Sequence, residues 1–193
     1  MGCDRAHPAR DVVSHSRRKS LGSSELVSNT SGVVALREIF DESDIEWITE
    51  ACQDPEIQRW TLVPRPYTRD HARHFVEHPE MEYWRWIVEQ DDTGTPVGLV
   101  SIHGVNDNGD AEVGYWVAPW GRGMRVMSSA LARVMDAAAT DPSIRALTAR
   151  IAEGNTASRR VVQRAGFIEV GRIESGCRDG DSPTDALLYR RAL

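Results

Sequence analysis

The sequence has few lysines and cysteines and no long apolar run. The scarcity of cysteine and the lack of an apolar run each exclude a class of protein. It contains one lysine against 22 arginines, and its three cysteines are Cys3, Cys52 and Cys177. Cysteines so few and so scattered form neither a disulfide framework nor a metal-binding spacing, which fits a reducing cytoplasm. No apolar run approaches the roughly 20 residues of a membrane-spanning helix, and no apolar segment of a secretory signal occurs near the start. We therefore expect a cytoplasmic protein without a membrane partner.

Charge is unevenly distributed along the chain. Residues 1–31 carry five basic and three acidic groups, and since the whole chain has a net charge of −6, residues 32–193 carry −8. An acidic domain repels a phosphate backbone, so we expect no nucleic-acid partner. The same charge is compatible with a cationic or amine-bearing partner.

Two regions differ in composition. Residues 1–31 are rich in serine and poor in large apolar side chains, so they cannot bury enough surface to offset the entropy of ordering. We expect a disordered basic extension there and a single folded domain over residues 32–193.

Within 32–193, helical and strand periodicities alternate. The order is a strand, helices, a three-strand meander, a helix, a strand, a helix and two strands, which predicts an α/β (α+β) fold. The sheet is expected to be mixed and mostly antiparallel, with one parallel crossover. The expected strands are 33–39, 84–88, 97–102, 111–117, 146–151, 167–173 and 186–190. The expected helices lie near 45–51, 55–60, 68–76, 125–139 and 155–165.

The stretch from Ala111 to Val126 carries the clearest chemical signal. A strand runs into a glycine-containing turn and then into a helix, which directs free backbone N–H groups and the positive helix end at one point. Arg122 and Arg125 add positive charge there. The pattern therefore favours a phosphate or pyrophosphate site, although neither a nucleotide P-loop nor a dinucleotide Gly-x-Gly-x-x-Gly motif is present.

Three segments together resemble the GCN5-related N-acetyltransferase (GNAT) superfamily, and within it the RimJ/RimL-like branch. Asp54–Thr61 with Pro64–Thr68 is similar to the branch's substrate-side region. Glu112–Trp120 is similar to its fourth strand and the entry to its acetyl-CoA loop. Asn155–Ser158, followed by Ala165–Phe167, is similar to its second CoA motif. The resemblance covers residues 33–193.

This resemblance implies a fold whose fourth and fifth strands splay apart and are flanked by helices. Acetyl-CoA is then the co-substrate, with its pantetheine arm between the splayed strands and its pyrophosphate on the loop at 122–127. A backbone N–H near Val117 is implied to polarise the thioester carbonyl. The residues implied to bind acetyl-CoA are Val117, Arg122, Gly123, Met124, Arg125, Val126, Met127, Asn155 and Ser158.

The acetyl-CoA loop departs from the family pattern Arg/Gln-x-x-Gly-x-Gly/Ala at one position. Aligned without a gap, Trp120 takes the first position, Gly123 the first glycine and Arg125 the second small residue. The Arg125 side chain then either crowds the pyrophosphate or turns outward and grips a phosphate with its guanidinium. We expect binding to be retained, because the helix end still offers its N–H groups.

The reaction requires an amine to lose a proton before it attacks the thioester. The resemblance places Glu112 as the base and Ser158 beside the departing sulfur, whereas their plain structural alternatives are a salt-bridged strand residue and a locally bonded helix residue. Trp60 and Tyr67 lie in the family's substrate region, and His103 ends a strand near it, so these three are expected to contact substrate. Direct attack in a ternary complex is expected, with no acyl-enzyme.

The predicted function is acetyl-CoA-dependent N-acetyltransfer to a primary amine, such as the N-terminal α-amine of a ribosomal protein. A small-molecule amine acetyltransferase and a non-catalytic acyl-CoA-binding module are the alternatives. No metal is expected, because the histidines at 71, 74 and 78 share a helix side without an accompanying metalloprotease motif. The oligomeric state is expected to be a monomer or a homodimer.

Overall fold

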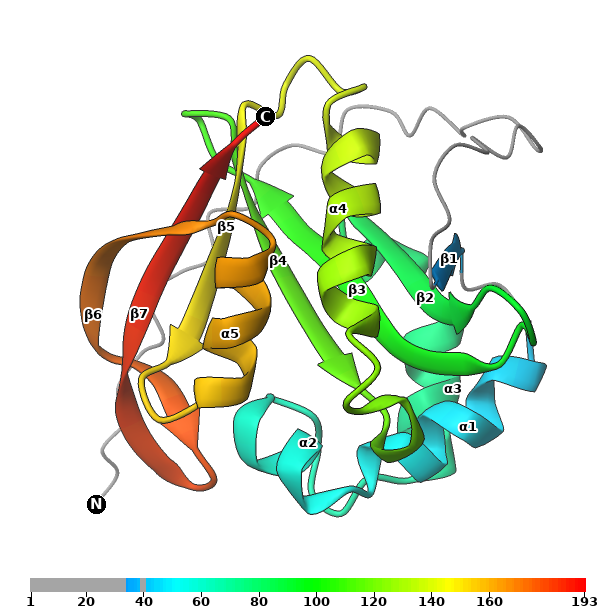
Figure 1. Cartoon of the computed structure of the whole chain (residues 1–193). Helices are drawn as coiled ribbons and strands as arrows, with labels where there is room; N and C mark the ends of the chain where they lie inside the picture. The colour runs from blue at the N-terminus through cyan, green and yellow to red at the C-terminus, as the bar shows by residue number, and fades with distance from the viewer. Residues whose placement is uncertain (1–33, 39–40) are drawn as a thin grey trace. The chain divides into compact units, whose positions relative to one another are not determined.

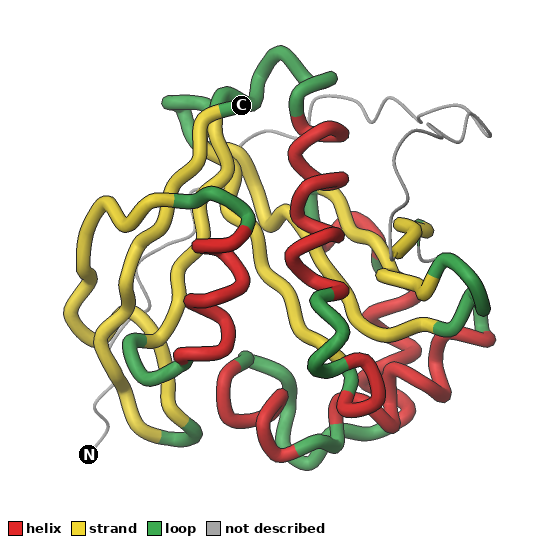
Figure 2. The backbone as a smooth tube through the Cα atoms, in the orientation of Figure 1, coloured by secondary structure: helices red, strands yellow, loops and turns green. Residues whose placement is uncertain are grey.

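The structure is a computed structural model that describes residues 34–38 and 41–193 (Figure 1, Figure 2). The expected basic extension at 1–31 lies outside the described residues. No helix among the described residues is long and apolar enough to cross a membrane.

A mixed seven-stranded sheet forms the centre of the fold, in the order β1-β2-β3-β4-β5-β7-β6. Every neighbouring pair is antiparallel except β4 and β5, which are parallel. This confirms the predicted mixed, mostly antiparallel sheet with one parallel crossover. The strands are β1 (Val34–Arg37), β2 (Trp84–Gln90), β3 (Pro96–Val105), β4 (Asp110–Val117), β5 (Ala146–Ala152), β6 (Ile168–Asp179) and β7 (Ser182–Ala192).

Helices cover both faces of the sheet (Figure 1). They are α1 (Ser43–Cys52), α2 (Pro55–Trp60), α3 (Arg69–Glu77), α4 (Val126–Ala138) and α5 (Thr156–Arg164), with short 3₁₀ turns at Pro79–Met81 and Pro119–Gly121. The main core joins one face of the sheet to α4 and α5, and a second cluster joins the other face to α1, α2 and α3.

Strand β4 contributes side chains to both layers because successive residues of a strand point to opposite faces. Val113, Tyr115 and Val117 pack in the core on the α4 and α5 side, whereas Trp116 packs in the cluster beneath α1. By the same alternation Glu112 shares the face of Trp116. One strand thus serves two sides of the sheet.

Strands β4 and β5 separate soon after they pair. Their parallel ladder has three pairs, from Asp110↔Ala146 to Glu112↔Thr148, and then stops. Strand β5 keeps its pairing with β7 along its whole length, from Ala146 to Ala152, so it follows β7 away from β4. The diverging ends are plain in Figure 1, and the predicted splay is confirmed.

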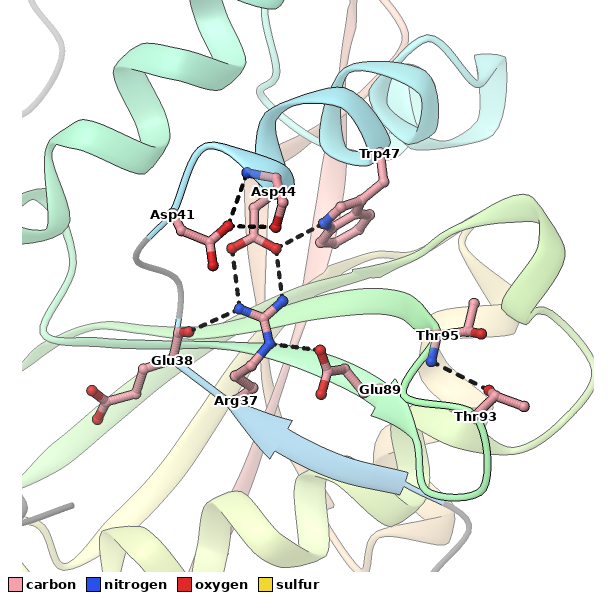
Figure 3. Close-up of polar contacts among 9 residues, drawn as sticks. Arg37, Glu38, Asp41, Asp44, Trp47, Glu89, Thr93 and Thr95 are labelled. Atoms are coloured by element: carbon pink, nitrogen blue, oxygen red, sulfur yellow. Dashed lines mark hydrogen bonds and ion pairs between the residues drawn. The ribbon is translucent and has the colours of Figure 1, made fainter. Parts of the chain in front are cut away.

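An ion pair between a buried carboxylate and a partly exposed arginine joins α1 to the edge of the sheet (Figure 3). The carboxylate of Asp44 is 1% exposed and accepts two hydrogen bonds from Arg37 of β1, at 2.7 and 3.1 Å. Arg37 also donates to Glu89 of β2, at 2.6 Å, and Trp47 donates to Asp44 at 3.1 Å. The hydrogen bond to Asp44 raises the pKa of Arg37 despite the opposing effect of burial. Since Trp47 also packs on Trp116, the network anchors the layer that covers β4.

The last two strands are longer than the sequence indicated. The expected strands 167–173 and 186–190 become a hairpin that reaches Asp179 and restarts at Ser182. The extra length contains Gly176 and a register shift between Ile173 and Cys177, features that obscure a period-two pattern. Pairing with β7 stabilises this segment, so its own side-chain pattern does not reveal it.

Candidate functional site

The splay exposes one edge of β4 toward β5. The N–H of Ala118 bonds to the carbonyl of Val97 on the β3 side, at 2.9 Å. Because backbone N–H groups alternate in direction along a strand, the N–H of Val117 points to the opposite edge, into the splay. The donor that the sequence assigned to a thioester carbonyl is therefore directed toward the space between the two strands.

The loop before α4 contains two residues in the left-handed conformation. Gly123 has φ 80°, and Arg125, directly before α4, has φ 59°. This region favours glycine, since a Cβ there lies close to the following carbonyl. Both positions that the sequence alignment assigned to small residues thus adopt a glycine-like backbone, and at one of them the chain carries an exposed arginine.

The other loop residues contribute in different ways. Val126 and Met127 are each 2% exposed and belong to the core, so only their backbone can face a ligand. Met124 is partly exposed, and its sulfur accepts a hydrogen bond from Gln90 at 3.3 Å. The N–H groups of the first turn of α4 have no partner within the helix, and they are the groups of this loop best suited to an anion.

Arg122 is engaged by a carboxylate. It forms a bidentate ion pair with Asp54, which also caps α2 by accepting the N–H of Ile57 at 3.0 Å. Burial is the largest single influence on Asp54 and acts against its ionisation, but the hydrogen bonds from Arg122 and from backbone N–H groups, together with the charge of Arg122, outweigh it and hold the pKa of Asp54 below its usual value. The sequence predicted that Arg122 binds acetyl-CoA but did not reveal its ion pair with Asp54, because the two residues are 68 positions apart in the chain.

Asn155 and Ser158 form the start of α5. Asn155 caps the helix by accepting the N–H of Ser158 at 3.0 Å, as its position in the sequence motif suggests. The Ser158 hydroxyl lies 2.8 Å from the phenol oxygen of Tyr115, which also donates to the Ser158 carbonyl at 3.1 Å. Tyr115 lies on the part of β4 that has left β5, so this contact joins α5 to the splayed strand.

Glu112 lies at the last β4–β5 pair, on the face away from α4. Its two carboxylate oxygens accept hydrogen bonds from Arg150 of β5, at 2.7 and 3.0 Å. This bond raises the pKa of Arg150, against the effect of burial. The partner was missed at the sequence level, because only the register of the parallel pair brings residue 150 beside residue 112.

His103 lies on the same face as Glu112. The β3–β4 register shifts at His103, between the pairs Ile102↔Val113 and Gly104↔Glu112, and the bulge leaves the histidine over Gly114. A Cβ at position 114 would lie 2.2 Å from its ring nitrogen, so glycine makes room for the ring. The Nδ1 atom of His103 is 2.6 Å from a carboxylate oxygen of Glu82.

Helix α2 lies at the open end of the splay (Figure 1). The ring of Trp60 reaches Gly154 in the loop after β5, where a Cβ would lie 3.4 Å from it. Arg59 forms a bidentate pair with Asp179 at the β6–β7 turn, at 2.5 and 3.0 Å. Trp60, the last residue of α2, thus lies against the loop that follows β5, and its contact with substrate stays a prediction.

Tyr67 is buried in the core beneath α1 and α3 rather than exposed at the splay. It is 6% exposed and packs in the core with Cys52, Ile57 and Ala72. Burial raises the pKa of both Tyr67 and Cys52, the thiol to about 12. The predicted substrate contact of Tyr67 is not accessible in this structure, because its apolar ring completes the packing between α1 and α3. Tyr67 was expected to contact substrate because it lies in the segment that resembles the family's substrate region, and that resemblance does not distinguish a core tyrosine from a groove tyrosine.

Comparison with known proteins agrees with this geometry. The profile of the acetyltransferase (GNAT) domain matches residues 34–168. The putative ribosomal N-acetyltransferase YdaF of Bacillus subtilis (strain 168) is 31% identical over 97 residues, which are 50% of this chain and 53% of that protein. The match therefore spans about half the length of that curated relative.

Solved structures share the fold over most of the chain. RimL, described as a ribosomal L7/L12 alpha-N-protein acetyltransferase in complex with CoA, has a TM-score of 0.75 at 22% identity and covers 88% of this chain and 98% of its own. Mycobacterium smegmatis RimJ, with a CoA-disulfide, has a TM-score of 0.72 at 23% identity over 83% and 82%. Spermidine N-acetyltransferase from Vibrio cholerae, with CoA and spermine, has a TM-score of 0.71 at 18% identity over 83% and 95%.

These identities establish the fold, and the family profile extends over more than two thirds of the sequence. The splayed strands, the loop before α4 and the cap of α5 stand where the sequence motifs predicted them. The chain therefore belongs to the acetyltransferase (GNAT) domain family.

Proposed function

We propose that this protein is an N-acetyltransferase that uses acetyl-CoA to acetylate a primary amine by direct attack in a ternary complex. The observation that supports it most is the splay itself, which begins after Glu112 and opens one edge of β4 toward β5. The family match supports the same conclusion. Acetyl-CoA, when bound, supplies the acetyl group as a thioester.

The acetyl-CoA side comprises the splayed strands and two helix starts. The first-turn N–H groups of α4 and the guanidinium of Arg125 bind phosphate, while the Val117 N–H stabilises negative charge that develops on the carbonyl oxygen. Asn155 holds the start of α5, and Ser158 donates a hydrogen bond to the leaving sulfur. A donor of the Val117 kind contributes about 10²–10³ in rate.

The acceptor side comprises the opposite face. Glu112, oriented by Arg150, takes the proton that the amine must lose, directly or through a water molecule. His103 and Trp60 line the approach of the substrate, His103 from the β3 bulge and Trp60 from α2. Because attack passes from this face to the splay, donor and acceptor reach one another through the gap that β4 and β5 leave.

A protein N-terminal α-amine is the leading acceptor. The names of YdaF and RimL support a ribosomal protein, and the net charge of −8 on residues 32–193 suits a cationic partner. Acetylation of a small amine is the second candidate, supported by the likeness to spermidine N-acetyltransferase.

Calorimetric titration with acetyl-CoA, with CoA in parallel, tests the acetyl-CoA site first. Micromolar binding is expected, followed by thiol release with N-terminal peptides that exceeds release with spermidine. Release with the polyamine alone would select the second candidate. Absence of binding by a well-folded sample would refute the acetyltransferase function and indicate a family member that has lost its acetyl-CoA site.

A further inference from the structure

Tyr115 makes two hydrogen bonds to one residue. Its phenol oxygen lies 3.1 Å from the carbonyl oxygen of Ser158 and 2.8 Å from the Ser158 hydroxyl oxygen. The N–H of Ser158 is held by Asn155 at 3.0 Å. The backbone N–H, the backbone carbonyl and the side chain of Ser158 therefore all have partners, and Tyr115 supplies two of the three contacts.

A count of protons decides how these groups are arranged. A phenol carries one proton, and a carbonyl oxygen can only accept. When Tyr115 donates to the Ser158 carbonyl, the short contact between the two hydroxyls is made by the Ser158 proton, directed at the phenol oxygen. When a charged acceptor enters the splay, the Ser158 proton can turn to it, and the phenol proton can turn from the carbonyl to the Ser158 oxygen.

We propose that Tyr115 is a positioning residue that holds the Ser158 hydroxyl and directs its proton to the leaving sulfur during acetyl transfer. The inference rests on the acetyltransferase function proposed above. No proton leaves either residue in this step. Two hydroxyl groups rotate, and the result is a chain in which the phenol donates to the serine oxygen and the serine donates to the thiolate.

The chemistry of the two hydroxyls favours such a chain. A lone serine hydroxyl is a modest donor, and a second hydrogen bond received at its oxygen polarises it and strengthens the bond that it gives. Burial raises the pKa of Tyr115, against the opposing effect of its bond to Ser158, so the phenol keeps its proton at neutral pH. Tyr115 thus acts as a neutral donor throughout.

A double-mutant cycle with Tyr115→Phe and Ser158→Ala tests this role. Tyr115→Phe is expected to lower kcat about tenfold, the effect of losing one hydrogen bond in the transition state, while the KM for acetyl-CoA changes less than twofold. In the Ser158→Ala background the same change is expected to lower kcat less than twofold. Ser158→Thr, which keeps the hydroxyl, is expected to restore the dependence on Tyr115.

Tyr83→Phe is the matched control, because Tyr83 lies outside the site and bonds to Asp141. Its kcat is expected to equal that of the unaltered protein. Should Tyr115→Phe fail to fold, 3-fluorotyrosine at position 115 preserves the ring and makes a stronger donor, and it is expected to change kcat only when Ser158 is present.

Two results overturn the proposal. An equal loss of kcat from Tyr115→Phe with and without the Ser158 hydroxyl would show that the Tyr115 hydroxyl acts independently of the Ser158 side chain. Unchanged kcat in both single variants would remove Tyr115 and Ser158 from the reaction. If the unaltered protein transfers no acetyl group to any amine, the proposed function itself fails, and the role of Tyr115 falls with it.

Discussion

Replacing Arg125 by glycine is expected to stabilise the protein and to weaken its binding of CoA. Arg125 has φ 59° directly before α4, a backbone region that suits glycine and disfavours other residues. Arg125 is exposed and directly precedes the first turn of α4, whose N–H groups lack partners within the helix. The substitution removes both the backbone strain and the positive charge. Loss of the strain is expected to raise Tm, whereas loss of the charge is expected to weaken the Kd for CoA.

The stability gain follows from two opposing contributions. A left-handed conformation costs a non-glycine residue about 1–2 kcal/mol, and glycine loses about 0.5–1 kcal/mol more conformational freedom on folding. The net gain in unfolding free energy is about 0.5–1 kcal/mol, which raises Tm by about 1–4 °C for a chain of this size. A charge-assisted bond to phosphate contributes about 1.5–3 kcal/mol, and solvent screening at this exposed position reduces that to roughly 1.4 kcal/mol, a tenfold weaker Kd.

Thermal melting and calorimetric titration with CoA measure the two effects on the same samples. Arg125→Ala is the matched control, because it removes the guanidinium and keeps the Cβ, so its Kd is expected to weaken tenfold without a rise in Tm. Tighter CoA binding by both variants would refute the reasoning and show that the Arg125 side chain crowds the phosphate. An unchanged Kd in both would show that the guanidinium makes no phosphate contact.

Three further perturbations test other parts of the structure. Glu112→Gln is expected to lower kcat by roughly 10²–10⁴ in an acetyl-transfer assay, since an amide cannot accept the amine proton, and an unchanged rate at every pH would remove Glu112 as the base. Asp44→Ala leaves Arg37 without its main partner and is expected to cost about 2–4 kcal/mol in urea unfolding, less than for a fully buried pair because Arg37 is partly exposed; a loss below 0.5 kcal/mol would show that the network of Figure 3 contributes little. The lowered pKa of Asp54 predicts a contribution to stability that is present above its unfolded pKa of about 4 and lost as pH falls through the lower folded value, so Asp54→Asn is expected to destabilise the protein at pH 7 and to flatten the acid limb of its stability curve. An identical pH dependence in both proteins would contradict that assignment.

Local signals in the sequence were sufficient to predict the order of the helices and strands and the two helix starts, of α4 and α5, that border the splay. The strand, turn and helix around β4 and α4, and the Asn155 cap of α5, depend on residues that are near neighbours in the chain. Alternation and helical period follow from backbone geometry, so they predicted the element order and the mixed sheet. They failed for the ends of β6 and β7, where pairing with another strand outweighs a weak local pattern.

Tertiary structure decided which side chains meet. Arg150 beside Glu112, Tyr115 beside Ser158 and Arg122 beside Asp54 are contacts between distant segments, and each depends on strand register or on the packing of a helix. The burial of Tyr67 was also decided by packing, because a tyrosine in a core and a tyrosine in a groove look the same in the sequence. By itself the sequence determined the family, the fold class and the location of the glycine-containing loop before α4, since backbone periodicity and short motifs encode them. The partners and accessibility of the site residues were determined only when the chain packed, since one residue of register moves every side chain to the other face of a sheet.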